Sequence, residues 1–136
     1  MSIHLEQAII ALQERKKAPT RLTRSSLLFK TIIKAIQDKK GANIVSLDLK
    51  KLDEAVADFF ILCEADSPLQ IKAIRDHIVE EVAKAAKEKP YHVEEGDQWS
   101  LIDYVNVVVH VFQEEYRKFY DLESLWMDAG RATHDL

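Results

Sequence analysis

The chain has 136 residues, of which 47% are hydrophobic, so it is long enough for one domain with a real core. Its net charge is -4 although the run RKKAPTRLTR at residues 15–24 carries five bases and no acid, and the acidic remainder suits a basic protein partner better than nucleic acid. No stretch approaches the roughly 18 consecutive apolar residues that span a bilayer, and the N-terminus lacks signal-peptide features, so we expect a cytoplasmic protein without membrane contact.

Residues 1–24 are interpreted as an N-terminal extension, helical and then basic, and residues 25–136 as a single domain. An apolar stripe of Leu5, Ala8, Ile9 and Leu12 at helical spacing predicts an amphipathic helix over residues 2–17, ended by Pro19. Two interpretations of this helix stay open: it packs on the domain, or it becomes ordered only on a partner.

A helix and two strands are predicted next. Ser25 or Ser26 can cap a helix that runs to Gly41. Its buried stripe consists of four apolar residues: Leu28, Ile32, Ala35 and Ile36. Strands follow at residues 42–49 and 57–65. The second strand holds the only cysteine, Cys63, whose apolar neighbours predict a buried and unreactive thiol.

A long helix is predicted from residue 68 to about residue 88. Asp66 and Ser67 supply capping side chains, and Pro68 fits the first helical turn. The predicted inner face carries five apolar residues: Ile71, Ile74, Ile78, Val82 and Ala85. His77 lies on the flank of this face, so we expect it to be half-buried or solvated.

The C-terminal half predicts more strands and a final helical region. Residues 91–95 can form a short strand, and residues 98–104 and 106–112 look like a hairpin that turns around residues 104–106. Residues 114–128 are helical in two pieces, with Asp121 as a plausible cap for the second piece. The order of elements predicts an α/β single domain in which a mixed β-sheet is flanked by helices.

Local signatures of catalysis are absent from the sequence. Its five histidines are scattered singly, and its three glycines form no phosphate-binding pattern, so we predict no metal site, cofactor site or catalytic residue. Two-metal nucleotidyl transfer would need paired acids on one strand. Asp48 and Asp103 each end a predicted strand, but Lys50 stands where the second acid of the first strand should be.

His110 lies in the middle of DYVNVVVHVF, residues 103–112. Alternation places Val107, Val109 and Val111 on one face of this strand and Val108, His110 and Phe112 on the other, so both faces are apolar and the strand is predicted to be central in the sheet. We therefore interpret His110 as a core histidine that hydrogen-bonds a neighbouring element.

Three blocks in order carry a family resemblance. They are W-x-L-x-D at residues 99–103, NVVVHVF at residues 106–112, and E-x-R-x-FYDLE-x-LW at residues 115–126. Together they resemble the ribosomal silencing factor family, also called Iojap-like. The resemblance implies a nucleotidyltransferase-like fold without the catalytic acids, and binding to the large ribosomal subunit through its fourteenth ribosomal protein. Occupying that intersubunit face would block subunit joining and repress translation under nutrient limitation.

The resemblance also implies a partner-binding surface on the strand that begins at Trp99. The predicted contact residues are Trp99, Ser100, Leu101, Ile102, Asp103 and Tyr104. Alternation places Trp99, Leu101 and Asp103 on one side of this strand. For Trp99, a core position is the alternative to partner contact. The basic run either contacts ribosomal RNA or forms a solvated linker, and a homodimer away from the ribosome is consistent with the family.

Two other functions stay open, a large-subunit assembly factor and a residual nucleotidyltransferase-like enzyme. The chain also departs from the family in the hairpin turn, which commonly reads D-L-G-D and here reads Asp103, Tyr104, Val105, Asn106. A β-branched valine is costly where glycine would supply a positive φ, so we expect a wider or shifted turn.

Overall fold

A six-stranded mixed sheet forms the centre of the molecule. The computed structural model describes residues 21–52, 56–121 and 130–135. Its elements are α2 (Leu27–Asp38), β1 (Ala42–Asp48), β2 (Phe59–Ala65), α3 (Pro68–Ala85), β3 (His92–Glu94), β4 (Trp99–Asp103), β5 (Val107–Gln113), α4 (Glu114–Tyr120) and β6 (Gly130–Thr133). The strand order is β3-β4-β5-β2-β1-β6, and the α/β fold with a mixed sheet flanked by helices is confirmed.

The two central strands, β2 and β5, are the parallel pair of the sheet, and they run in register from Phe59 opposite Val107 to Ala65 opposite Gln113. Every residue of β2 is buried, as expected for a strand that is covered on both faces. The other strand pairs are antiparallel. A parallel pair needs a long crossover, and α3 with β3 and β4 provides it.

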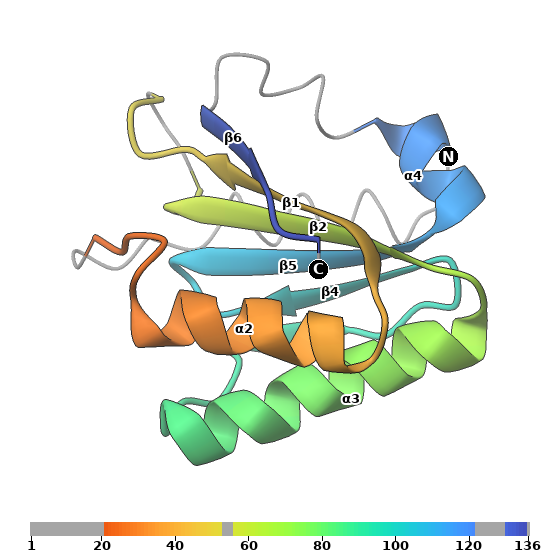
Figure 1. The fold of residues 1–136 in the computed structure, drawn as a ribbon, viewed down its shortest axis with the longest axis horizontal. Helices are drawn as coiled ribbons and strands as arrows, with labels where there is room; N and C mark the ends of the chain where they lie inside the picture. Colours follow the sequence, from red (N-terminus) through yellow and green to blue (C-terminus); the bar gives the residue numbers. More distant parts are fainter. Residues whose placement is uncertain (1–20, 53–55, 122–129, 136) are drawn as a thin grey trace.

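Helices α2 and α3 lie side by side on one face of the sheet, whereas α4 lies on the opposite side, beyond the end of β2 (Figure 1). Four of the predicted inner residues of α3 are buried, but Ala85 is exposed, because the helix ends there instead of continuing to residue 88. Ser67 caps α3 by accepting a hydrogen bond from Gln70 N at 3.1 Å. Ser26, the N-cap residue of α2, makes no such bond.

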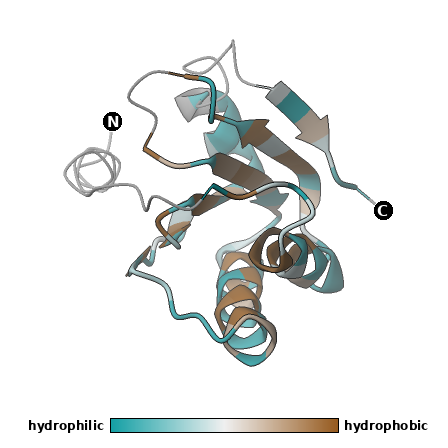
Figure 2. Cartoon of the chain, turned by 90° about the vertical axis from the view of Figure 1, so that its left-hand side faces the viewer, coloured by the Kyte–Doolittle hydropathy of each residue, from teal (hydrophilic) through white to brown (hydrophobic). Residues whose placement is uncertain are grey.

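The sheet buries a separate apolar cluster on each face. The first cluster lies under α2 and α3 and includes Ile32, Ile74, Ile102 and Val109. The second cluster, on the opposite face, consists of Val45, Leu47, Leu49, Ala57, Phe60, Leu62, Trp99, Leu101, Val108 and Phe112. Figure 2 shows hydrophobic residues concentrated on the central strands. We call the sheet face that carries the second cluster the second face.

Strand β6 was not predicted from the sequence. It pairs with β1 from Gly130 opposite Asp48 to Thr133 opposite Val45. Asp121 has a φ of 44° and ends α4, and the predicted helical piece beyond it lies outside the described residues. The predicted helix over residues 2–17 also lies outside them, so the division into residues 1–24 and 25–136 stays a prediction. Among the described helices, none is long and apolar enough to cross a membrane.

Candidate partner-binding site on β4

All six predicted contact residues lie on β4 or directly after it, and all are buried, with Trp99 only 2% exposed. The alternation predicted from the sequence is confirmed, because Trp99 and Leu101 belong to the second cluster whereas Ile102 and Tyr104 belong to the first. The six residues therefore point to two different layers of the molecule. A single partner surface cannot include both layers.

The helix-facing half of the predicted site serves packing. Arg75 of α3 donates from Nη1 to Ser100 Oγ at 3.3 Å, and Ser100 Oγ donates to Gly96 O at 3.0 Å. Ile102 is fully buried in the first cluster. Burial raises the pKa of Tyr104 above its ordinary range, so its hydroxyl stays protonated. Ser100, Ile102 and Tyr104 thus attach β4 to the layer under α3.

The other half of the predicted site contains an aromatic cluster on the second face. Trp99 stacks on Phe112 with ring centroids 5.2 Å apart and on His110 at 5.6 Å. Phe60 approaches His110 at 4.6 Å from the other side. Leu101 lies opposite His110 in the β4–β5 register. We call Phe60, Trp99, His110 and Phe112 the aromatic cluster.

His110 is a core histidine, as predicted. It is 1% exposed, and its Nδ1 accepts a hydrogen bond from Trp99 Nε1 at 3.1 Å. Burial lowers the pKa of His110 to about 3, so the imidazole is neutral. Since Nδ1 is an acceptor, the proton lies on Nε2, which has no hydrogen-bond partner among the described residues. The ring acts as a structural acceptor for Trp99.

The turn between β4 and β5 is tight and lies at residues 104–106, so the expectation of a wider or shifted turn was wrong. Asn106 N donates to Tyr104 O at 2.9 Å, and Val105 between them has a φ of 70°. This is a γ-turn with positive φ at its central residue, a strained form. Asp103 Oδ1 accepts from Val105 N at 2.7 Å and helps to hold it. Valine therefore occupies the conformation that glycine adopts most easily.

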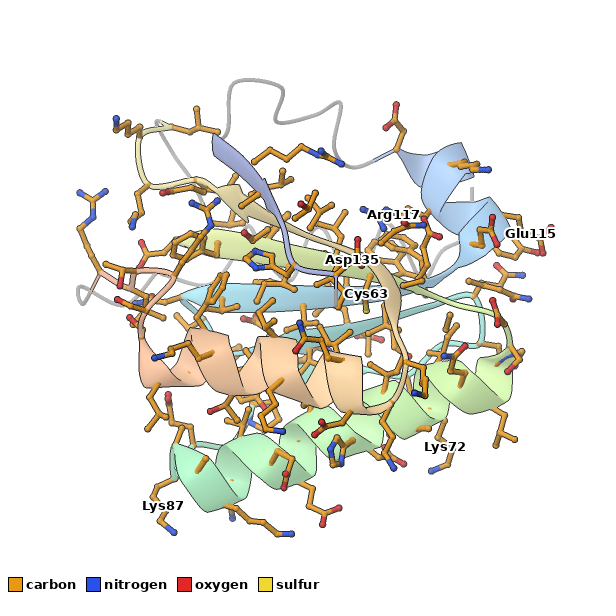
Figure 3. All side chains as sticks on the ribbon, viewed as in Figure 1. Cys63, Lys72, Lys87, Glu115, Arg117 and Asp135 are labelled. Carbon is orange, nitrogen blue, oxygen red and sulfur yellow. The ribbon has the colours of Figure 1, made fainter. Side chains whose placement is uncertain are left out.

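Exposed acidic side chains stand in the chain segments directly before β4 and after β5. The loop before β4 and the start of α4 meet, since Gln113 N donates to Gln98 O at 2.9 Å. These segments carry three exposed acids, Asp97, Glu114 and Glu115, which we call the acidic rim. Glu95 is also exposed, but it lies 3.9 Å from Arg75 of α3, on the helix side of the sheet. Figure 3 shows Glu115 pointing away from the sheet and Arg117 pointing toward it.

Helix α4 is fixed to the second face by a buried ion pair. Arg117 Nη1 lies 3.3 Å from Glu64 Oε1 and donates to Asn43 O at 2.6 Å. Both side chains of the pair are largely buried. Because removing one partner of such a pair leaves an uncompensated charge, we infer that α4 holds one position on the sheet.

The two acids considered for metal-dependent chemistry lie on β1 and β4, with β2 and β5 between them. Three strand spacings amount to about 14 Å, whereas two-metal sites hold their ions about 4 Å apart. Asp48 instead lies 3.7 Å from Lys50 Nζ. The described geometry therefore does not combine Asp48 and Asp103 into one metal site.

One group that the sequence reading missed is Asp38, His77 and Glu81, whose possible ligand atoms lie within 4.8 Å of one another. His77 and Glu81 are four residues apart on α3, a spacing that could have drawn attention to them, but Asp38 comes from α2. His77 Nε2 lies 3.1 Å from Asp38 Oδ2, and this hydrogen bond lowers the pKa of Asp38. We interpret the group as a polar contact between the two helices.

Comparisons with known proteins give the family. The family described as "Ribosomal silencing factor during starvation" matches residues 23–136. Ribosomal silencing factor RsfS of Halalkalibacterium halodurans is 37% identical over 107 residues, which cover 75% of this chain and 87% of that protein. The same-named protein of Bacillus subtilis is 34% identical over 113 residues, covering 79% and 92%. Protein Iojap, chloroplastic, of Zea mays is 31% identical over 103 residues, covering 76% of this chain and 43% of that protein.

Solved structures agree with the sequence comparisons. A crystal structure of a protein from Chromobacterium violaceum matches with a TM-score of 0.68 and 34% identity, covering 73% of this chain and 82% of that one. Another, from Bacillus halodurans, matches with a TM-score of 0.64 and 34% identity, covering 80% and 97%. On the sequence blocks, the fold and these matches, the chain belongs to the ribosomal silencing factor family.

Proposed function

We propose that the protein binds the large ribosomal subunit through its fourteenth ribosomal protein at the intersubunit face and thereby blocks subunit joining. The inhibitor is steric in this proposal, so its action depends on a binding surface and on no chemical step. Repression would operate under nutrient limitation, in keeping with the family description.

The observation that carries the proposal is the pairing of the aromatic cluster with the acidic rim. Trp99 and Leu101 are apolar residues of the kind that dominates binding energy at interfaces, and binding would have to expose them, since they are 2% and 1% exposed here. The exposed acids of the rim stand in the segments before β4 and after β5 and suit a basic ribosomal protein, which they would orient more than hold. We therefore restrict the proposed contact on β4 to the second-face side.

The basic run at residues 15–24 is the part of the chain proposed for contact with ribosomal RNA, and two of its bases are among the described residues. Arg24 donates from Nε to Ser46 Oγ at 2.9 Å and from Nη2 to Gly130 O at 2.9 Å, and Arg21 donates to Lys50 O. Two of the five bases are thus bonded to the domain. The proposed RNA contact therefore rests mainly on Arg15, Lys16, Lys17 and the exposed Arg21. A homodimer through the second face would need the same surface as the ribosomal partner.

Charge reversal on the rim tests the proposal without disturbing the core. The variant Asp97→Lys with Glu115→Lys should lower the affinity for isolated large subunits by about tenfold or more, since like charges would then face a basic partner. The control Glu80→Lys with Glu88→Lys makes the same charge change at exposed positions on α3 and just after it and should bind like the parent. Co-sedimentation with large subunits measures both.

Inhibition of subunit joining is the second measurement, beside binding to large subunits. The parent protein should prevent isolated subunits from joining, and the rim variant should require a correspondingly higher concentration. Unchanged subunit joining at saturating parent protein would refute the steric mechanism. If the rim variant and the α3 control lost affinity for large subunits equally, the proposed location of the contact at the acidic rim would be refuted.

A further inference from the structure

Asp38, His77 and Glu81 form, among the residues that the structure describes, a cluster with the donor atoms of a metal site. His77 and Glu81 are four residues apart on α3, so their side chains are neighbours on one face of that helix. Asp38 is the last residue of α2, which lies beside α3 (Figure 1). We call these three residues the interhelical cluster.

The distances within the interhelical cluster fit a small cation. His77 Nε2 lies 3.1 Å from Asp38 Oδ2. Two ligand atoms that bind one tetrahedral zinc ion at about 2.1 Å lie about 3.4 Å from each other. All three possible ligand atoms lie within 4.8 Å of one another, so Glu81 has to move by at most about 1.4 Å. A rotation within its long side chain supplies this movement.

The chemical character of the donors selects the class of ion. An imidazole nitrogen is a good ligand for zinc, nickel, copper and iron, whereas magnesium and calcium prefer oxygen ligands alone. One nitrogen and two carboxylates provide three protein ligands, which leaves the fourth position of a tetrahedral zinc ion for water. The donor set therefore favours zinc and similar ions over magnesium.

A groove between α2 and α3 gives access to the interhelical cluster. Asp38 and Glu81 line this groove together with the small side chains of Ala35 and Ala85. Asp38 is exposed, and His77 and Glu81 are partly exposed. An ion and its water ligand can therefore enter from solvent along the groove.

Two lysines neutralise the carboxylates of the interhelical cluster when no ion is bound. Lys34 Nζ lies 3.3 Å from Asp38 Oδ1, and Lys84 Nζ lies 3.8 Å from Glu81 Oε2. The two lysine side chains are 77% and 67% exposed. Because ion pairs at such exposed positions contribute little to stability, a divalent ion displaces the lysines at small cost.

We propose that Asp38, His77 and Glu81 bind a divalent cation of the zinc class, which joins the end of α2 to α3. The ion replaces the hydrogen bond between His77 and Asp38 with bonds from both residues to one metal. Since the three ligands come together only in the folded chain, binding stabilises the helical layer. The inference does not depend on ribosome binding, so its failure would leave the proposed function untouched.

Calorimetric titration of the full chain with zinc chloride tests the site. The parent protein should bind one zinc ion at the interhelical cluster, and its melting temperature should rise by about 3 °C or more at a large excess of zinc over the dissociation constant. Magnesium chloride at the same concentration should change the melting temperature by less than about 1 °C. Cobalt(II) in place of zinc should show the visible absorption of a four-coordinate ion.

His77→Gln removes the nitrogen ligand but keeps a side chain that can donate a hydrogen bond to Asp38. Its affinity for zinc should fall about tenfold or more, since even residues that only support a metal ligand contribute about 10- to 100-fold. His92→Gln is the matched control, because His92 Nε2 lies 2.6 Å from Glu94 Oε1 on β3 and the described ranges place no third ligand near this pair. The control should bind zinc like the parent, and circular dichroism checks the fold of both variants.

Lys84→Gln provides a second comparison, because it removes a cation that competes for Glu81. Its zinc affinity should rise severalfold. Absence of a saturable zinc site in the parent, or equal affinities of the parent and His77→Gln, would overturn the proposal. An equal loss in His92→Gln would overturn the location of the site. Should His77→Gln not fold, unchanged or weaker zinc binding by Lys84→Gln would overturn the proposal instead.

Discussion

Val105 has a backbone conformation that its side chain disfavours. It sits at the centre of the γ-turn with a φ of 70°, where a β-branched residue is strained. Val105→Gly should raise the free energy of unfolding by about 1 kcal/mol, because relief of strain outweighs the added freedom of the unfolded chain. Urea unfolding measures this. Val105→Ala keeps the positive φ with a smaller side chain, so its free energy of unfolding should rise less. A loss of stability in the glycine variant would contradict the assignment of backbone strain to Val105.

His110 makes stability depend on pH. Its pKa falls from the ordinary 6.5 to about 3 in the folded state, so the unfolded chain takes up a proton first as the pH drops. The stabilisation from neutral His110 is complete above about pH 6.5 and is lost progressively toward pH 3, amounting to about 2 kcal/mol between pH 7 and pH 5. His110→Asn keeps an acceptor for Trp99 Nε1 and should lose this part of the slope. Equal slopes in urea unfolding would argue against burial of His110.

At the scale of single elements, the serine N-caps of α2 and α3 can be compared directly. Ser67 Oγ accepts from Gln70 N at the start of α3, whereas Ser26 makes no capping bond and its Oγ accepts from Thr23 N instead. Ser67→Ala should therefore cost about 1 kcal/mol, and Ser26→Ala clearly less. Chemical unfolding of the two variants checks the difference. Equal costs would mean that the cap bond of α3 contributes nothing.

Element prediction succeeded where the pattern was local. The apolar stripes of α2 and α3, the Ser67–Pro68 start and the alternation on β4 each follow from spacing alone. Strand β6 has no such pattern, since GRAT alternates weakly and its partner β1 is far away in the chain. Its position depends on long-range bonds: His134 Nε2 lies 2.8 Å from Ser46 Oγ, and Asp135 Oδ1 accepts from Ile44 N at 3.0 Å.

At the scale of the whole molecule, the three sequence blocks that resemble the family identified β4 as the candidate binding strand. They did not predict which residues pack around it. Alternation predicted that Trp99 and Leu101 share a face. It could not predict that Trp99 would be buried against His110 and Phe112, because that depends on which strands become neighbours and on what covers the sheet. Trp99, a residue proposed for partner contact, is thus a core residue in this structure, and binding through it would require the chain around it to rearrange.

The same strand order bears on the remaining enzymatic alternative. A nucleotidyltransferase-like activity would need acids that gather around metal ions, and Asp48 and Asp103 are separated by β2 and β5. Millimolar nucleoside triphosphate with magnesium should therefore change the melting temperature by less than about 1 °C, since a ligand stabilises a protein only by binding its native state. Differential scanning fluorimetry provides the measurement. A rise of several degrees that disappears in Asp48→Asn, but persists in Asp38→Asn on the helical side, would reinstate a nucleotide site at the end of β1.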